Sequence, residues 1–174
     1  MRTRGILWLQ GCLGLLAAWL AGCAGYHLGP TGGAVAGEKS IRINFFTNKT
    51  PEPRLSEAIA AALRKKLQQD GTYKLSTHGE ADIVVTGNIL RFERIGLSYQ
   101  PQDILTVRDY IARLVAHVTA TEVQGGKVIF DGDIGGQTTI RTGNDLPSSE
   151  RQALPIIAED FAKNATSHLT EGKW

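Results

Sequence analysis

Two long segments of alternating residues constrain the fold of this chain more than any other feature. In residues 107–123 and 127–141, apolar or small residues occupy alternate positions, which is typical of half-buried β-strands. Gln124-Gly125-Gly126 lies between them and is typical of a hairpin turn. The predicted core residues are Tyr110, Ala112, Leu114, Ala116, Val118, Ala120, Val128, Phe130, Ile134, Thr138 and Ile140.

Alternation also predicts strands over residues 40–47, 73–77 and 82–95. In the first of these, Ile41, Ile43 and Phe45 are expected to face the core. Gly87 inside the last one indicates a bulge or the close approach of a helix.

Two amphipathic helices complete the pattern. Residues 53–69 form the first, which ends at Gly71, and a capping box of Ser149 and Gln152 precedes the second. Their apolar faces are Leu55, Ile59, Ala62, Leu63 and Leu67, and Ile157, Phe161, Ala165 and Leu169. The fold class is therefore α+β, a two-layer sandwich in the order β-α-β-β-β-β-α, with both helices on one face of a mainly antiparallel mixed sheet.

The opposite face of the sheet is expected to be open to solvent or to a partner. On the strand over residues 107–123 it carries Asp109, Ile111, Arg113, Val115, His117, Thr119 and Thr121.

The N-terminus has the parts of a bacterial lipoprotein signal. Arg2 and Arg4 precede a short apolar run, and Leu20-Ala21-Gly22-Cys23 is similar to a lipobox. We expect residues 1–22 to be cleaved, Cys23 to carry lipid, residues 23–38 to form a lipidated N-terminus and flexible tether, and residues 39–174 to form one periplasmic domain. The alternative is an ordinary signal peptide or an uncleaved anchor.

The sequence contains no recognisable catalytic, metal or cofactor motif, so we expect no enzyme activity, no metal and no cofactor beyond the lipid. The four histidines have no ligand spacing, and Asp131 with Asp133 is interpreted as a solvated face rather than an acid–base pair. Without residues 1–22 the formal net charge is zero, which gives no argument for nucleic-acid binding.

Four arginines are the best candidates for a local anion site. Arg91 and Arg94 end one predicted strand, and Arg108 and Arg113 begin the next, so a hairpin between these strands would bring them together. Guanidinium groups suit phosphate. Surface ion pairs with Glu93, Asp103 and Asp109 are the alternative explanation.

Four segments of the chain resemble the lipopolysaccharide-assembly outer-membrane lipoprotein family (LptE-like). They are residues 23–28 (Cys-Ala-Gly-Tyr-His-Leu, one residue longer than the family's Cys-Gly-Tyr start), 45–55, 81–87 (Ala-Asp-Ile-Val-Val-Thr-Gly) and 130–139. The resemblance implies a non-enzymatic plug inside an outer-membrane β-barrel that inserts lipopolysaccharide, anchored by lipid and facing the periplasm or the barrel interior. Lipopolysaccharide is the implied ligand, and Arg91, Arg94, Arg108 and Arg113 are the hypothetical contacts.

A second resemblance stays open. The strand, the Asn-x-Thr turn at Asn48, the helix and the segment over residues 81–87 are also similar to periplasmic scaffold modules of curli-secretion lipoproteins and of the Tol-system propeller protein. A stoichiometric β-barrel partner would favour the first family, and a homo-oligomeric ring or a peptidoglycan-linked partner the second.

Overall fold

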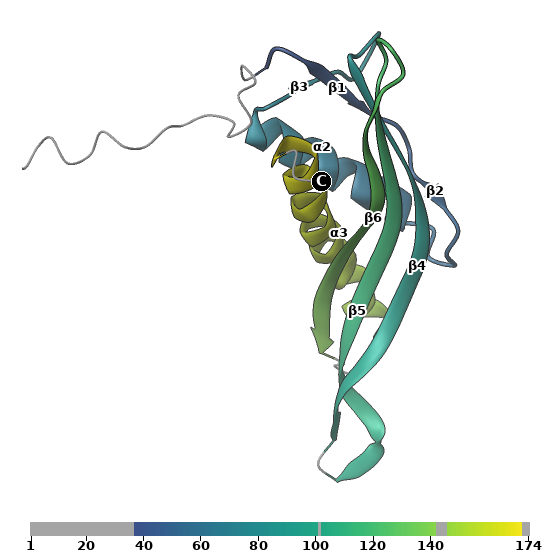
Figure 1. Cartoon of the computed structure of the whole chain (residues 1–174). Coiled ribbons are helices and arrows are strands. Elements are labelled where there is room, and N and C mark those ends of the chain that lie inside the picture. Colours follow the sequence, from purple (N-terminus) through teal and green to yellow (C-terminus); the bar gives the residue numbers. More distant parts are fainter. Residues whose placement is uncertain (1–36, 101, 142–145, 172–174) are drawn as a thin grey trace, which may run out of the picture.

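The computed structural model describes residues 37–100, 102–141 and 146–171, and the expectations for residues 1–36, including Cys23, lie outside them. The described residues form one mixed sheet of six strands and two helices (Figure 1). The elements are β1 (Ser40–Ile43), β2 (Thr47–Asn48), α2 (Leu55–Asp70), β3 (Lys74–Leu75), β4 (Ile83–Gln100), β5 (Asp103–Glu122), β6 (Val128–Arg141) and α3 (Leu146–Glu171). The predicted α+β class and element order are confirmed, with the first predicted strand divided into β1 and β2.

The sheet has the strand order β3-β1-β4-β5-β6, and β2 pairs with β4 beside β1. The three long strands β4, β5 and β6 pair antiparallel. Strand β1 pairs in parallel with both β3 and β4, and β2 pairs in parallel with β4. Gly125 and Gly126 take φ values of 93° and 67° in the turn between β5 and β6, as the hairpin prediction requires.

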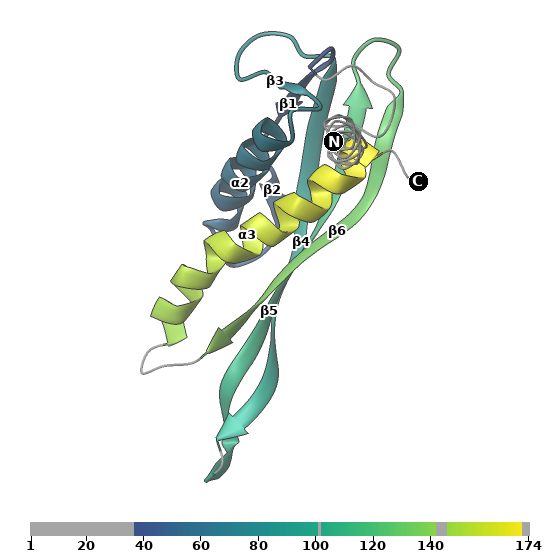
Figure 2. The same cartoon turned by 90° about the vertical axis from the view of Figure 1, so that its left-hand side faces the viewer.

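Both helices cover the same face of the sheet (Figure 2). Helix α2 buries Leu55, Ile59, Leu63 and Leu67 as predicted, whereas Ala62 is only partly buried and the buried alanine is Ala60. The helix ends at Gly71, whose φ is 76° and whose N–H donates to the Leu67 carbonyl over 3.1 Å. Helix α3 begins at Leu146, so Ser149 lies inside the helix and the predicted capping box is wrong.

Helix α3 also covers part of the free edge of β6. Asn164 Nδ2 donates to the Gly135 carbonyl over 2.8 Å, and the Gln137 N–H donates to Asp160 Oδ2 over 2.9 Å. Between them, Gly136 touches the helix so closely that a Cβ there would lie 2.6 Å from the Ile157 carbonyl oxygen. Capping of an exposed edge strand limits pairing with other chains.

The break between β1 and β2 changes which aromatic residue is buried. Phe45 is 74% exposed and Phe46 is 3% exposed, so the prediction that Phe45 faces the core is wrong. The Phe46 ring meets the Phe161 ring edge-on, with centroids 6.0 Å apart, and a Cβ at Gly87 would lie 2.3 Å from Phe46 Cε1. Gly87 therefore accommodates a phenylalanine ring rather than a helix.

Val128 is a second correction, because it is 52% exposed instead of facing the core. The register between β5 and β6 shifts after Ala120, so that Thr121 pairs with Val128 on the other face.

Beyond the end of β6, strands β4 and β5 continue as a two-stranded ribbon that neither helix covers (Figures 1 and 2). We call residues 96–100 of β4 and 103–108 of β5 the finger. Residues 96–98 form its base, level with the last residues of β6, and the rest extends beyond β6. The sequence pattern predicts strands only up to residue 95 and from residue 107, and the structure extends both strands into the finger.

Candidate anion-binding site

The face of the sheet away from the helices, called the open face below, carries polar side chains from β4, β5 and β6 in register. Its rows run from Thr86, Thr119 and Asp131, through Asn88, His117 and Asp133, to Glu93, Arg113 and Gln137, and end with Ser98, Asp109 and Arg141. All of these side chains are at least partly exposed except Asp109, which is 7% exposed.

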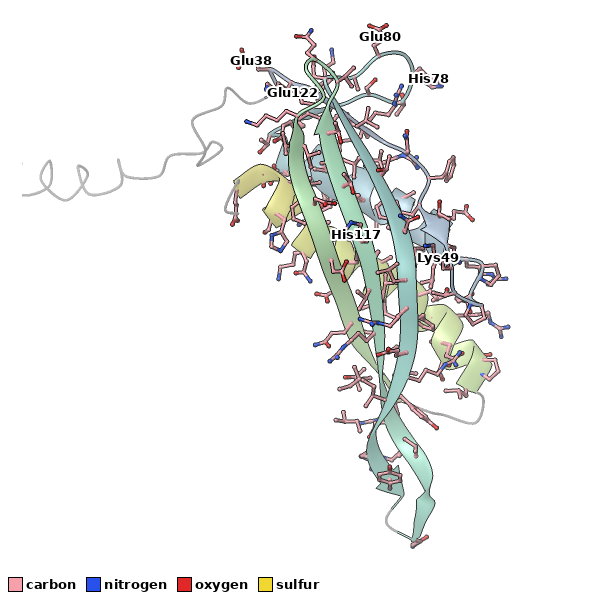
Figure 3. The ribbon with its side chains drawn as sticks, turned by 45° about the vertical axis from the view of Figure 1, so that its right-hand side comes forward. Glu38, Lys49, His78, Glu80, His117 and Glu122 are labelled. Atoms are coloured by element: carbon pink, nitrogen blue, oxygen red, sulfur yellow. The ribbon has the colours of Figure 1, made fainter. Side chains whose placement is uncertain are left out.

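His117 lies at the middle of the open face (Figure 3). Its Nδ1 lies 2.8 Å from Asp133 Oδ1 and its Nε2 lies 3.0 Å from Asp131 Oδ1. The hydrogen bond to Asp133, with the charges of both carboxylates, raises the pKa of His117 despite partial desolvation. Asp131 and Asp133 are 57% and 54% exposed at the side chain, so they flank an imidazole on a solvated face.

Two of the four predicted arginines lie further along the same face. Glu93 pairs directly with Arg113 across β4 and β5, and Arg91 Nε lies 3.6 Å from Glu93 Oε1. Arg113 Nη2 donates to Gln137 Oε1 over 3.3 Å. The Arg91 side chain is 61% exposed, so an outside group can reach its guanidinium.

Arg94 lies on the other face of the sheet, where it pairs with Ala112 in register and its Nη2 donates to Glu150 Oε2 of α3 over 3.0 Å. Its guanidinium also lies 5.6 Å from the centroid of the Phe92 ring. The arginines predicted from the sequence therefore do not form one cluster.

At the base of the finger, Asp109 binds three donors. It accepts hydrogen bonds from Ser98 Oγ over 2.5 Å, from Arg108 Nε over 3.0 Å and from Arg141 Nε over 3.1 Å. These donors lower the pKa of Asp109 to about 2, the Ser98 hydroxyl most strongly and then Arg108.

Arg141 was missed by the sequence reasoning, although a signal for it exists. Asp109 and Arg141 lie equally far from Gly125 in the chain, so counting outward from the hairpin turn places them opposite each other, as the register does. Both arginines bind Asp109 through Nε. Arginine has further N–H donors on its two terminal nitrogens, which suit phosphate oxygens.

Among the described residues, no group of three or more histidine, cysteine or acidic side chains has the geometry to hold a metal ion. No described helix combines the length and the apolar character needed to span a bilayer.

Solved structures show that this fold occurs among bacterial lipoproteins. A minor lipoprotein from Acinetobacter baumannii has a TM-score of 0.51 at 16% identity, covering 76% of this chain and 92% of its own. A hypothetical protein from Chlamydia trachomatis has a TM-score of 0.56 at 8% identity, covering 76% and 95%, and a Xanthomonas campestris protein has 0.54 at 10%, covering 84% and 95%. At these identities the likeness concerns the fold alone.

The family follows from the sequence. The model of the LptE lipopolysaccharide-assembly family matches residues 38–169, and the chain belongs to that family. None of the curated proteins matches this chain significantly.

Proposed function

We propose that this protein is an outer-membrane lipoprotein that acts, without catalysis, with a β-barrel partner in the transport and assembly of lipopolysaccharide. The observation that carries the proposal is the family match over residues 38–169, which coincides with almost the whole described fold. In this role the domain faces the periplasm or lies inside the barrel as a plug.

The partner is tested by affinity purification of the tagged chain from native outer membranes. We expect one large β-barrel protein in stoichiometric amount, released together with lipopolysaccharide. A homo-oligomeric ring without a barrel, or a peptidoglycan-linked partner, would contradict the proposal and favour the periplasmic scaffold function.

Lipid on Cys23 is the second part of the proposal. The residues before Cys23 are small, as an extended peptidase substrate needs, and removal of residues 1–22 leaves it as the single cysteine of the chain. Several acyl chains give stable attachment, since each buried CH₂ contributes about 0.8 kcal/mol. Ala24 follows Cys23 where an inner-membrane lipoprotein usually has aspartate, which supports the outer membrane.

Cys23→Ser is expected to give an unlipidated, mislocalised protein. Metabolic labelling with a palmitate analogue should mark the wild type and not the variant, and equal labelling of both would refute lipidation at this position.

The four predicted arginines are proposed to contact lipopolysaccharide phosphates, Arg91 and Arg113 from the open face and Arg94 and Arg108 from near the base of the finger. The open-face pair offers the cleaner test, because neither residue binds a buried acid. We expect Arg91→Glu with Arg113→Glu to weaken lipopolysaccharide binding by roughly tenfold or more, as loss of charge-assisted contacts implies.

The matched control reverses two exposed lysines outside the site, Lys49→Glu with Lys127→Glu. Equal affinity of the arginine and lysine variants, with unchanged circular dichroism, would remove the arginines from the binding site.

A further inference from the structure

The finger carries apolar side chains that the described parts of the chain leave uncovered. Leu97 and Tyr99 are 54% and 53% exposed, and Ile95 just above the base of the finger is 41% exposed. Neither helix lies against the finger in two views at right angles (Figures 1 and 2). A two-stranded ribbon is only marginally stable in water by itself, so contact with an apolar environment would stabilise it.

Three arginines lie near the base of the finger, and each binds an acid that is largely buried. We call Arg94, Arg108 and Arg141 the collar. Their side chains are 46%, 48% and 79% exposed, whereas the side chains of their partners Glu150 and Asp109 are 15% and 9% exposed. The collar therefore presents positive charge outward although each arginine has an acidic partner.

We propose that the finger is a membrane-contact site, in which Leu97 and Tyr99 enter the interfacial region of a bilayer and the collar binds anionic phospholipid head groups. Tyr99 lies beyond the row of Ser98 and Asp109, and Leu97 lies just before that row. Exposed apolar groups therefore flank the level at which Arg108 and Arg141 bind Asp109, as contact with a membrane surface requires. Tyrosine, with an apolar ring and a polar hydroxyl, suits the boundary between hydrocarbon and head groups. Attraction of basic residues to anionic lipid adds to the burial of apolar area.

Contact of the finger with a bilayer would also affect how the domain lies at the membrane. Strand β1, near which the described chain begins, lies at the end of the molecule opposite to the finger (Figure 1). A lipid on Cys23 ahead of β1 and a finger in the same bilayer would attach the domain to the membrane from both ends. The contact is independent of the barrel partner, and it orients the chain before a partner binds.

The test uses tryptophan reporters in the full chain reconstituted in vesicles of phosphatidylglycerol and phosphatidylcholine with brominated acyl chains. Tyr99→Trp reports on the finger and Phe45→Trp reports on an exposed aromatic site outside it, with the wild-type emission subtracted. We expect bromine to quench residue 99 by about twofold or more and to leave residue 45 unquenched, because only a side chain in the interfacial region meets the acyl chains.

Two further variants test the role of the apolar side chains, and a change of lipid tests the role of charge. In the Tyr99→Trp background, Leu97→Asn should reduce the quenching, whereas Val123→Asn, at an equally exposed valine in the body, should not. Replacing phosphatidylglycerol by neutral lipid should also reduce it.

The proposal is overturned if residue 99 stays unquenched, if residue 45 is quenched equally, or if neutral vesicles quench as strongly as anionic ones. Quenching that requires added lipopolysaccharide would also overturn it and assign the finger to that ligand instead. Leu97→Trp serves as a second reporter if Tyr99→Trp alters the circular dichroism.

Discussion

Gly136→Ala is expected to destabilise the domain strongly, because the contact of α3 with β6 leaves no room for a methyl group. A Cβ would lie 2.6 Å from the Ile157 carbonyl oxygen, 2.7 Å from the Phe161 nitrogen and 2.8 Å from Phe161 Cβ. The first two atoms are four residues apart in α3 and belong to its hydrogen-bonded backbone, so relief requires moving the helix. Phe161 is fully buried, which makes that movement costly.

The magnitude follows from overpacking. Extra methyl groups in a packed core cost about 1–3 kcal/mol. The change from glycine to alanine offsets about 0.4–1 kcal/mol of this cost, because it lowers the conformational entropy of the unfolded chain. We therefore expect a net loss of roughly 1–2 kcal/mol, which corresponds to a fall in Tm of about 3–10 °C for a domain of this size.

Gly135→Ala is the matched control, because Gly135 directly precedes Gly136 on the same strand. Its nearest contact for a Cβ is the Leu114 carbonyl oxygen at an ordinary 3.5 Å, and its φ is not positive. This variant should be neutral or slightly stabilising, by about 0.5 kcal/mol. Thermal and urea unfolding followed by circular dichroism measure both variants. Equal stability of Gly135→Ala and Gly136→Ala would refute the packing described for α3 on β6.

Three further predictions test other parts of the molecule. Phe46→Ala should cost about 3–5 kcal/mol and Phe45→Ala no more than about 1 kcal/mol, because only Phe46 is buried; similar losses in urea unfolding would contradict the break between β1 and β2. The depressed pKa of Asp109 contributes stability that is present above its unfolded pKa and lost as the pH falls from about 4 toward about 2, so Asp109→Asn should lower Tm at neutral pH and remove that part of the acid sensitivity. The raised pKa of His117 contributes stability that is full below the unfolded value of about 6.5 and lost as the pH rises through the folded pKa. An NMR titration should show this pKa reduced more by Asp133→Asn than by Asp131→Asn, and the reverse order would contradict the assignment of the stronger hydrogen bond.

The layers of the fold were predictable because burial imposes a period on the sequence. The stripe from Leu55 to Leu67 and the alternation from Ala112 to Ala120 each bury one side, and both patterns survive in the structure. Phe45 and Val128 were misassigned because a strand break and a register shift reverse the alternation locally. Neither irregularity leaves a mark in the pattern of apolar residues itself.

The candidate site was less predictable, since charged side chains carry no period that tells one face from the other. Arg94 is grouped with Arg91 by its position in the chain, but the odd spacing of three residues on a regular stretch of β4 places the two on opposite faces. Asp109 was expected on an open surface, and it is buried by arginines from two strands. The position of Arg141 opposite Asp109 could be predicted only by counting the strand register outward from Gly125.

The open face and the finger differ in what they need from their surroundings. On the open face, His117 lies between two carboxylates and Arg91 lies beside Glu93, so its described charges have partners and water can cover the rest. On the finger, no described element covers Leu97 and Tyr99, which remain half exposed, and the hydrophobic effect favours their removal from water. Burial of the finger by another surface thus offers a larger gain in free energy than burial of the open face, where paired polar groups would have to be desolvated. The open face therefore suits contact with water, whereas the stability of the finger depends on the surface that covers it.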